Sequence, residues 1–269
     1  MRFGVCTWIF DDTPLKVVAA HLAGMGYDGV ELFGDPEEYP AGEVLPVLRD
    51  RGMKVLSLTP KDVDLAHPEA NVRRSALDYY FRLIDYAAEL GAPMLTCHGA
   101  VGRIRAIDGQ RREEGLFHDE VRRVAERAQQ SDVRVCLEVL NRYESHLLNR
   151  AEQARRMVDR IDSPALGILL DTYHMNIEEQ DPVGAVKIAG EKLFGFHAAD
   201  SNRRAIGRGH VPFEAHWNAL REIGYGGDIV VECVAPGPDP FTPTADGDWR
   251  EAVFSEVRES LEVLRRLRG

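Results

Sequence analysis

The chain has 269 residues, of which 44% are hydrophobic and 29% are charged, and this composition excludes a chain that is disordered throughout. The formal net charge of −11 disfavours general binding to the phosphate backbone of nucleic acids. No apolar run approaches the roughly 18 to 20 residues that a membrane-spanning helix needs, and the first residues have the pattern of a strand rather than of a signal peptide. We therefore expect a cytoplasmic protein with no nucleic-acid partner and no membrane association.

Short apolar runs alternate with amphipathic stretches along the whole chain. The runs are almost entirely apolar, which is typical of strands whose two faces are both buried in a parallel sheet. In chain order, we expect strands at residues 2–8, 29–33, 54–58, 94–98, 134–139, 166–170, 193–198 and 229–234.

The amphipathic stretches have apolar residues at helical spacing. The clearest is 72–90, in which Leu77, Phe81, Ile84 and Ala88 recur on one face. The complete set of expected helices is 15–25, 42–51, 72–90, 113–129, 151–161, 182–189, 214–223 and 249–267.

Eight strand–helix units in about 250 residues predict one closed (β/α)8 barrel. The competing architecture is a doubly wound open sheet, which usually has a glycine-rich turn after its first strand. Residues 8–12 contain no glycine, so the barrel is favoured. No segment has the composition of a linker, and we expect a single α/β domain that spans residues 1–269.

The four cysteines, Cys6, Cys97, Cys136 and Cys233, lie far apart in the sequence, each in or at the end of an expected strand. A disulfide framework is not expected in a chain of this length in a reducing compartment. We interpret them as buried thiols, because free cysteine is among the most buried residue types.

Polar residues end four consecutive expected strands. Glu138, Asp171, His197 and Glu232 each follow a short apolar run. In a closed barrel these ends converge on one mouth, and a buried carboxylate there must be paired or bind a cation. Three carboxylates with one imidazole suit Mn²⁺, Mg²⁺ or Co²⁺ better than a structural zinc ion. The sequence therefore predicts a divalent metal site built from these four residues.

Further polar residues follow the same strands. Glu144, His174 and Arg203 each come shortly after a strand that already carries a predicted ligand. Glu144 and Arg203 are as consistent with solvated loop positions as with the cavity, whereas His174, between Tyr173 and Met175, is expected to line the pocket.

Two stretches, residues 138–149 and 170–179, closely resemble ketose 3-epimerases of the D-tagatose/D-psicose (allulose) type. Residues 202–204, 207–209 and 220–227 support the resemblance. These enzymes belong to the xylose isomerase-like TIM barrel superfamily of sugar phosphate isomerases and epimerases. That superfamily also includes hydroxypyruvate isomerase, inosose isomerases and endonuclease IV.

The resemblance implies an isomerase that inverts C3 of a ketose through a cis-enediolate. It implies one divalent ion, with Mn²⁺ expected and Co²⁺ or Mg²⁺ as alternatives, held by the four residues named above. Glu138 and Glu232 would be the acid/base pair on opposite faces of the sugar. Glu144, His174 and Arg203 would hold the O1–O3 end of the ketose. Such enzymes form homo-oligomers, so a dimer or tetramer is expected.

The fourth strand departs from the epimerase pattern. It ends in His98, and the following residues 101–105 are basic rather than aromatic. We expect His98 to bind the far end of the sugar, and the basic loop indicates a shorter, more polar or phosphorylated substrate.

The main rival is a sugar-phosphate or hydroxypyruvate/inosose-type isomerase on the same metal site. Its support is the basic run Arg203, Arg204, Arg208 and His210 after the seventh strand, near the place where barrels often bind phosphate. An endonuclease would need more histidines and is opposed by the net charge. A non-catalytic binding barrel is disfavoured because both Glu138 and Glu232 are present.

Overall fold

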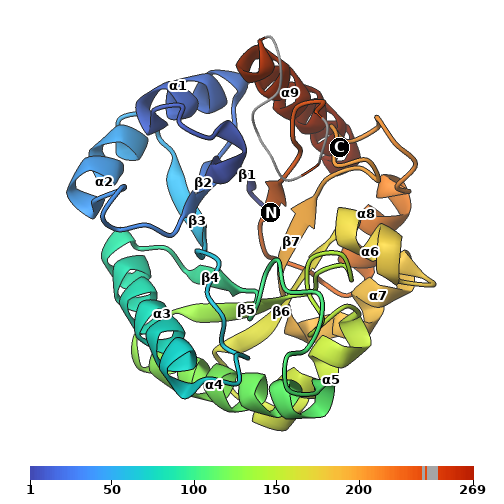
Figure 1. Ribbon diagram of the computed structural model, residues 1–269. Helices are drawn as coiled ribbons and strands as arrows, with labels where there is room; N and C mark the ends of the chain where they lie inside the picture. The colour runs from blue at the N-terminus through green and yellow to red at the C-terminus, as the bar shows by residue number, and fades with distance from the viewer. Residues whose placement is uncertain (238–239, 241–247) are drawn as a thin grey trace.

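The computed structural model describes residues 1–237, 240 and 248–269. Eight parallel strands close a barrel in the order β1 to β8, because β1 pairs with both β2 and β8. Figure 1 looks onto one end of the barrel, with the strands gathered at the centre and the helices forming an outer ring. The predicted (β/α)8 barrel is therefore confirmed.

The strands fall within or close to the expected ranges. The first is shorter than expected, because the chain leaves the sheet after Cys6 and enters a 3-10 helix, η1 (Thr7–Phe10). The strands are β1 (Phe3–Cys6), β2 (Gly29–Phe33), β3 (Lys54–Thr59), β4 (Met94–Cys97), β5 (Arg134–Glu138), β6 (Leu166–Asp171), β7 (Leu193–Ala198) and β8 (Ile229–Val231).

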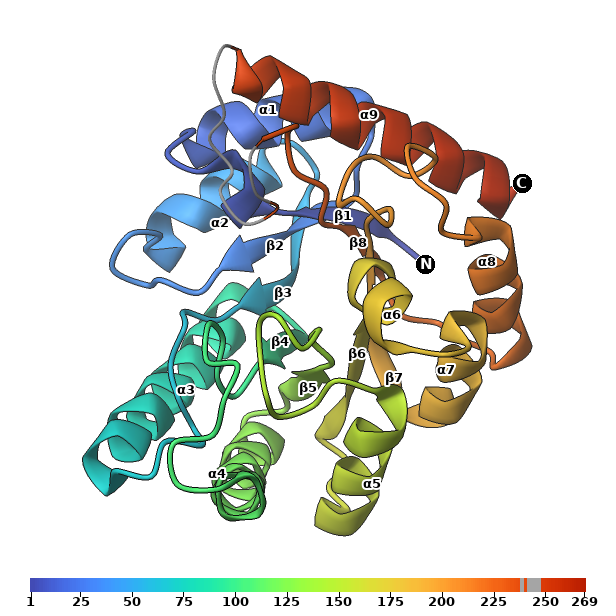
Figure 2. The ribbon, with the colours of Figure 1, turned by 45° about the vertical axis from the view of Figure 1, so that its right-hand side comes forward.

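Eight of the helices correspond to the expected ones and pack around the barrel (Figure 2). They are α1 (Leu15–Met25), α2 (Ala41–Arg49), α3 (Ala70–Leu90), α4 (Gln110–Gln130), α5 (Ala151–Ile161), α7 (Pro182–Ala189), α8 (Phe213–Glu222) and α9 (Trp249–Arg268). A short 3-10 helix, η2 (Gly190–Lys192), leads into β7. The helix α6 (Thr172–Glu178) was not expected from the sequence.

The helix α6 starts directly from the end of β6. The Asp171 side chain accepts a hydrogen bond from the backbone N–H of Tyr173, which satisfies one of the free donors at the helix start. As a result His174 lies on a buried turn of helix rather than in a loop.

All four cysteines are buried and free, as predicted. Burial raises the pKa of Cys97 to about 12, so its thiol is protonated at neutral pH. Among the described residues, no helix combines the length and apolar character that crossing a membrane requires.

Strand register places the predicted polar residues side by side. Since all strands are parallel, their carboxyl ends meet at one mouth of the barrel. Asp171 pairs directly with His197 across β6 and β7. Glu138 is the last residue of β5, and Glu232 directly follows β8.

Candidate metal centre and active site

The structure brings the four predicted ligands together. One ligand atom from each of Glu138, Asp171, His197 and Glu232 lies within 4.8 Å of the others, and all four side chains are buried. The His197 Nδ1 atom lies 3.3 Å from Glu232 Oε2 and 3.7 Å from Glu138 Oε1. The geometry thus matches the convergence that the strand ends predicted.

The second oxygen of each glutamate is held by a neighbouring donor. The Trp8 indole N–H donates to Glu232 Oε1 at 2.7 Å, and His98 Nε2 lies 2.8 Å from Glu138 Oε2. Each carboxylate therefore has one oxygen fixed at the edge of the site, and its other oxygen faces His197.

Asp171 provides the test of whether a cation fits here. Its Oδ1 atom accepts from the Tyr173 N–H at 2.9 Å, but its buried Oδ2 atom has no hydrogen-bond partner among the described residues. Burial and the nearby Glu232 carboxylate raise the pKa of Asp171 well above its ordinary value. An unsatisfied buried oxygen among carboxylates is the environment that a divalent ion stabilises, so the donor set fits the expected metal.

Arg203 places a positive charge beside the carboxylates of the site. It is buried in the loop after β7, with a left-handed backbone φ of 56°. Its guanidinium lies 3.3 Å from Glu232 and 3.8 Å from Glu144, and it stacks over the rings of Trp8 and Tyr173. Burial alone would raise the pKa of Glu232, but Arg203 and His197 outweigh it and hold that pKa well below its usual value.

Glu144 and His174 share one donor. The Asn141 side-chain amide donates to Glu144 Oε1 at 2.6 Å and to His174 Nδ1 at 2.8 Å. Burial and the charge of Arg203 lower the pKa of His174 well below its ordinary value, so the imidazole is neutral. Burial raises the pKa of Glu144 to about 7 against the opposing charge of Arg203. Both side chains are buried, and both line the cavity at the mouth of the barrel.

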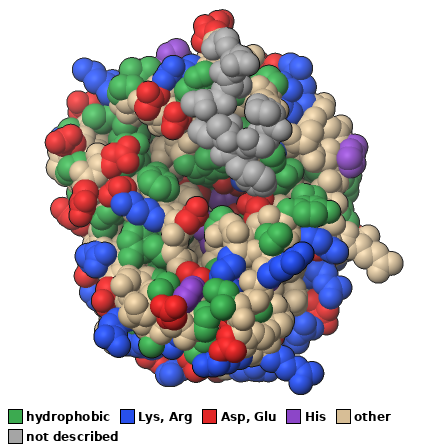
Figure 3. Space-filling view, viewed as in Figure 1, with side chains coloured by type: hydrophobic (Ala, Val, Ile, Leu, Met, Phe, Trp, Pro, Cys, Tyr) green, Lys and Arg blue, Asp and Glu red, His purple; other side chains and the backbone are tan. Residues whose placement is uncertain are grey.

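A cavity of about 220 Å³ lies over these groups. Figure 3 shows the hollow at the centre of this face, with acidic and histidine side chains at its base. Its other wall comes from the ends of β2 and β3 and from the segments that follow β1, β3 and β4, and of these residues only His98 was predicted as a site residue. The cavity is lined by Trp8, Phe33, Thr59, Pro60, Asp62, His98, Val101, Glu138, Leu140, Glu144, His174, Arg203 and Glu232.

The basic loop after β4 does not serve the pocket as its composition suggested. Arg103 turns away and forms ion pairs with Asp64, at 2.8 Å, and with the buried Glu113. Of residues 101–105, only Val101 lines the cavity.

Two arginines of the run after β7 are also paired on the outside of the site. Arg204 binds the carboxylate of Glu256, and Arg208 binds Glu259 at 2.7 Å. His210 lies 3.0 Å from the Ser201 hydroxyl. Only Arg203 of this run lines the cavity.

Glu31 in β2 was also missed. It is fully buried, and its Oε2 atom lies 3.2 Å from His197 Nε2. The signal was present in the sequence, because a carboxylate stands between the apolar residues Val30 and Leu32.

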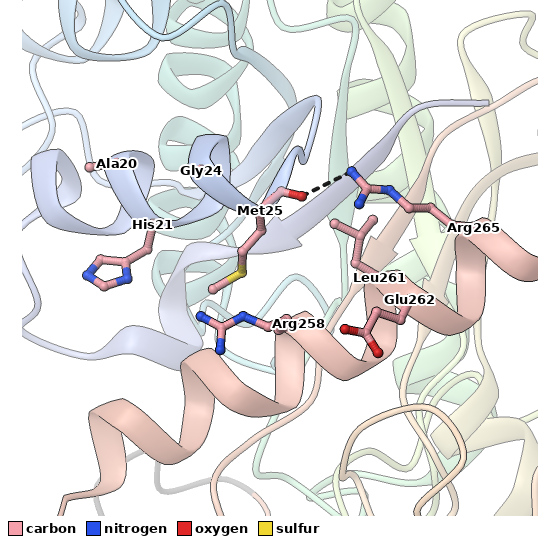
Figure 4. Close-up of a pocket in the computed structure, with 8 residues that line it drawn as sticks. All are labelled: Ala20, His21, Gly24, Met25, Arg258, Leu261, Glu262 and Arg265. Carbon is pink, nitrogen blue, oxygen red and sulfur yellow. Dashed lines mark hydrogen bonds between the residues drawn. The ribbon is translucent and has the colours of Figure 1, made fainter.

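A larger groove of about 560 Å³ lies between α1 and α9, on the outer side of the barrel (Figure 4). Its best-defined contact is the Arg265 guanidinium, which donates to the Met25 carbonyl at 3.0 Å. It has no cluster of carboxylates, and the chemistry belongs to the smaller cavity at the barrel mouth.

Comparison with known proteins agrees with the fold. A family model described as xylose isomerase-like TIM barrel matches residues 19–267. A ketose 3-epimerase of Arthrobacter globiformis is 33% identical over 233 residues, which cover 85% of this chain and 80% of that protein. A D-psicose 3-epimerase of Ruminiclostridium cellulolyticum is 34% identical over 231 residues, which cover 82% and 78%.

A solved structure extends the likeness to the whole chain. The D-psicose 3-epimerase of Clostridium cellulolyticum H10, solved with D-tagatose, matches with a TM-score of 0.90 and 25% identity over 99% of both chains. The chain therefore belongs to the xylose isomerase-like TIM barrel family and, within it, to the carbohydrate epimerases of the ketose 3-epimerase group.

Proposed function

We propose that this protein inverts C3 of a free ketose through a cis-enediolate, with Glu138 and Glu232 as the acid/base pair. The observation that carries the proposal is the placement of two buried carboxylates, on β5 and after β8, at one cavity. Two strands, β6 and β7, separate them in the barrel, which supports a placement of the two groups on opposite faces of the bound sugar. Inversion at carbon requires one group to remove the proton and another to return it from the opposite face.

We propose one divalent ion, Mn²⁺ in preference to Co²⁺ or Mg²⁺, held by Glu138, Asp171, His197 and Glu232. The ion would polarise the C2 carbonyl and the C3 hydroxyl of the ketose, which makes the C3 proton more acidic. The carboxylate-rich donor set supports a hard divalent ion.

The chain's own residues position the sugar. Arg203, Glu144 and the neutral His174 offer donors and acceptors to the O1–O3 end of the substrate. Trp8 and His98 each fix one oxygen of Glu232 and Glu138, which sets the orientation of both carboxylates at the cavity. His98, beside Asp62 in the cavity wall, also faces the far end of the sugar.

The ion pairs of the arginines beside the site favour a free sugar over a phosphorylated one. Arg204 and Arg208, which could have bound a phosphate, are instead paired with Glu256 and Glu259.

A panel of ketoses and ketose phosphates in D₂O with Mn²⁺, followed by NMR, tests the proposal. We expect deuterium at C3 together with inversion at that carbon for a free ketose. Deuterium at C1 with formation of an aldose would identify an isomerase instead. Turnover of ketose phosphates alone, with inhibition by millimolar inorganic phosphate, would favour the sugar-phosphate isomerase.

A further inference from the structure

The barrel holds a fifth carboxylate, outside the four-residue cluster. Glu31 lies in the middle of β2 and is fully buried. A buried carboxylate destabilises a fold unless hydrogen bonds or opposite charges compensate for its lost hydration. The hydrogen bonds and charges around Glu31 therefore indicate its role.

Neighbouring side chains fix both Glu31 oxygens. Oε1 accepts from the Thr59 hydroxyl at 2.6 Å and from the Cys6 thiol at 3.3 Å. Oε2 accepts from the Ser57 hydroxyl, and Ser57 is the residue opposite Glu31 on β3. These contacts leave one interaction that points to the site, the 3.2 Å approach of Oε2 to His197 Nε2.

The two nitrogens of His197 therefore face different groups. Nδ1 faces Glu138 and Glu232, where the metal is proposed, and Nε2 faces Glu31. A histidine binds a metal through a nitrogen that carries no proton, so the proton must be on Nε2 and needs an acceptor there.

We propose that Glu31 is a positioning residue, which accepts the Nε2–H of His197 and so fixes the ring and its tautomer with Nδ1 free for the metal. This inference rests on the metal centre proposed above. Ser57 and Thr59 extend the same chain of hydrogen bonds, because their hydroxyls donate to the Glu31 carboxylate, which in turn faces the His197 ring.

A second metal ion is the competing interpretation of the same groups. Ligand atoms of Cys6, Glu31 and His197 also lie within 4.8 Å of one another. However, both oxygens of Glu31 already accept hydroxyl hydrogen bonds, and the Cys6 thiol donates a hydrogen bond to Glu31. Hydrogen bonding therefore accounts for this group, and we favour the positioning role.

The test is the dissociation constant for Mn²⁺ of metal-stripped wild-type protein and of Glu31→Gln, measured by calorimetric titration. The glutamine side chain has one acceptor oxygen, whereas both oxygens of the Glu31 carboxylate accept hydrogen bonds. We therefore expect the Kd for Mn²⁺ to rise about 10- to 100-fold. Glu120→Gln is the matched control, because Glu120 pairs with Arg73 on the outer helices. Its Kd should equal the wild-type value.

A second readout separates positioning from general destabilisation. The ¹⁵N spectrum of histidine-labelled protein with Mg²⁺ should show His197 protonated only at Nε2 in the wild type and a mixture of tautomers in Glu31→Gln. If Glu31→Gln does not fold, Ser57→Ala keeps the carboxylate and removes one of its donors. We then expect a smaller but measurable rise in Kd.

The outcomes distinguish the two proposals. A wild-type protein that binds no divalent ion would overturn the metal centre, and the positioning role with it. A wild-type protein that binds Mn²⁺ as tightly as Glu31→Gln does would overturn the positioning role alone. Two ions per wild-type chain, falling to one in Cys6→Ala, would replace positioning with a second metal site.

Discussion

Arg203 connects the charged groups of the site, since its guanidinium contacts both Glu232 and Glu144 and stacks on two aromatic rings. A buried arginine between two carboxylates fixes their protonation as well as their position. Its removal should therefore change both substrate binding and the pH dependence of the reaction.

We expect Arg203→Ala to raise KM for ketoses at least tenfold, which corresponds to about 1.4 kcal/mol of lost binding. Arg203 lowers the pKa of Glu232, so without it that pKa rises and the acidic limb of kcat/KM moves to higher pH. The measurement is a pH profile of both constants. Arg208→Ala is the control, because Arg208 lies in the same loop but pairs with Glu259, and it should behave as the wild type. An unchanged acidic limb in Arg203→Ala would contradict the assignment.

The two glutamates allow a sharper prediction, because each would act on one epimer. Glu138→Gln and Glu232→Gln should each lower kcat for epimerisation by about 10²- to 10⁴-fold, the usual contribution of general acid–base catalysis. In D₂O, each variant with metal bound should still exchange the C3 proton of one epimer, and the two variants should prefer opposite epimers. Exchange of the same epimer by both variants would rule out two bases on opposed faces.

Residues that end a strand could be predicted from the sequence, whereas a residue inside a strand was overlooked. Glu138, Asp171, His197 and Glu232 stand out because an apolar run stops at each of them. Glu31 is surrounded by apolar residues on both sides, and its role depends on partners from β1, β3 and β7. The catalytic and binding roles of all these residues stay predictions, since the geometry tests only their placement.

At the scale of elements, the loop after β4 is anchored from several directions. Glu113, at the start of α4, accepts from Arg103 and from the backbone N–H groups of Ile107 and Asp108, and His146 Nε2 lies 3.0 Å from its carboxylate. The same loop binds the next one, because the Gly102 N–H donates to the Glu144 carbonyl at 2.8 Å. One buried carboxylate thus holds the cavity wall that includes Val101.

We expect Glu113→Gln to loosen this loop, because an uncharged amide replaces a carboxylate that four groups contact. KM should rise several-fold, and protease cleavage within residues 99–109 should become faster. The free energy of unfolding should fall by about 1–3 kcal/mol, the usual penalty when a buried hydrogen-bonded partner is lost. Glu114→Gln is the control, since this neighbour is only partly buried and its carboxylate accepts a hydrogen bond from the Gln110 side chain. Equal KM values for the two variants would show that the anchor does not reach the pocket.

The elements themselves were predictable where their local pattern was strong. Every barrel strand and all eight outer helices follow from apolar runs and helical spacing. The helix α6 has seven residues and begins on a hydrogen bond to Asp171, so no long periodicity indicates it. The ion pairs of Arg103 with Asp64 and Glu113 join three separate segments, and sequence alone gives no distance between them.

At the scale of the whole molecule, barrel closure is what makes a site from residues distant in sequence. The side chains of residues 138 and 232 come close together because β5 to β8 are consecutive strands of one closed sheet. The resulting centre concentrates three carboxylates on a chain whose net charge is already −11. A bound cation should therefore stabilise the entire fold. The cytoplasmic location, the single domain and the dimer or tetramer stay predictions.

We expect metal removal to lower Tm, because an ion that binds only the folded state stabilises it by RT ln(1 + [metal]/Kd). At Mn²⁺ one hundred times above Kd this is about 2.7 kcal/mol, which for a chain of this size raises Tm by roughly 5–10 °C. Calorimetry in EDTA and in Mn²⁺ measures the difference. Asp171→Asn is the informative variant, since it removes a ligand charge and also relieves the repulsion between Asp171 and Glu232. Its Tm in EDTA should equal or exceed that of the stripped wild type, whereas Mn²⁺ should add little. A wild-type Tm that is the same in EDTA and Mn²⁺, or an equal gain in Asp171→Asn, would contradict a metal held by these four residues.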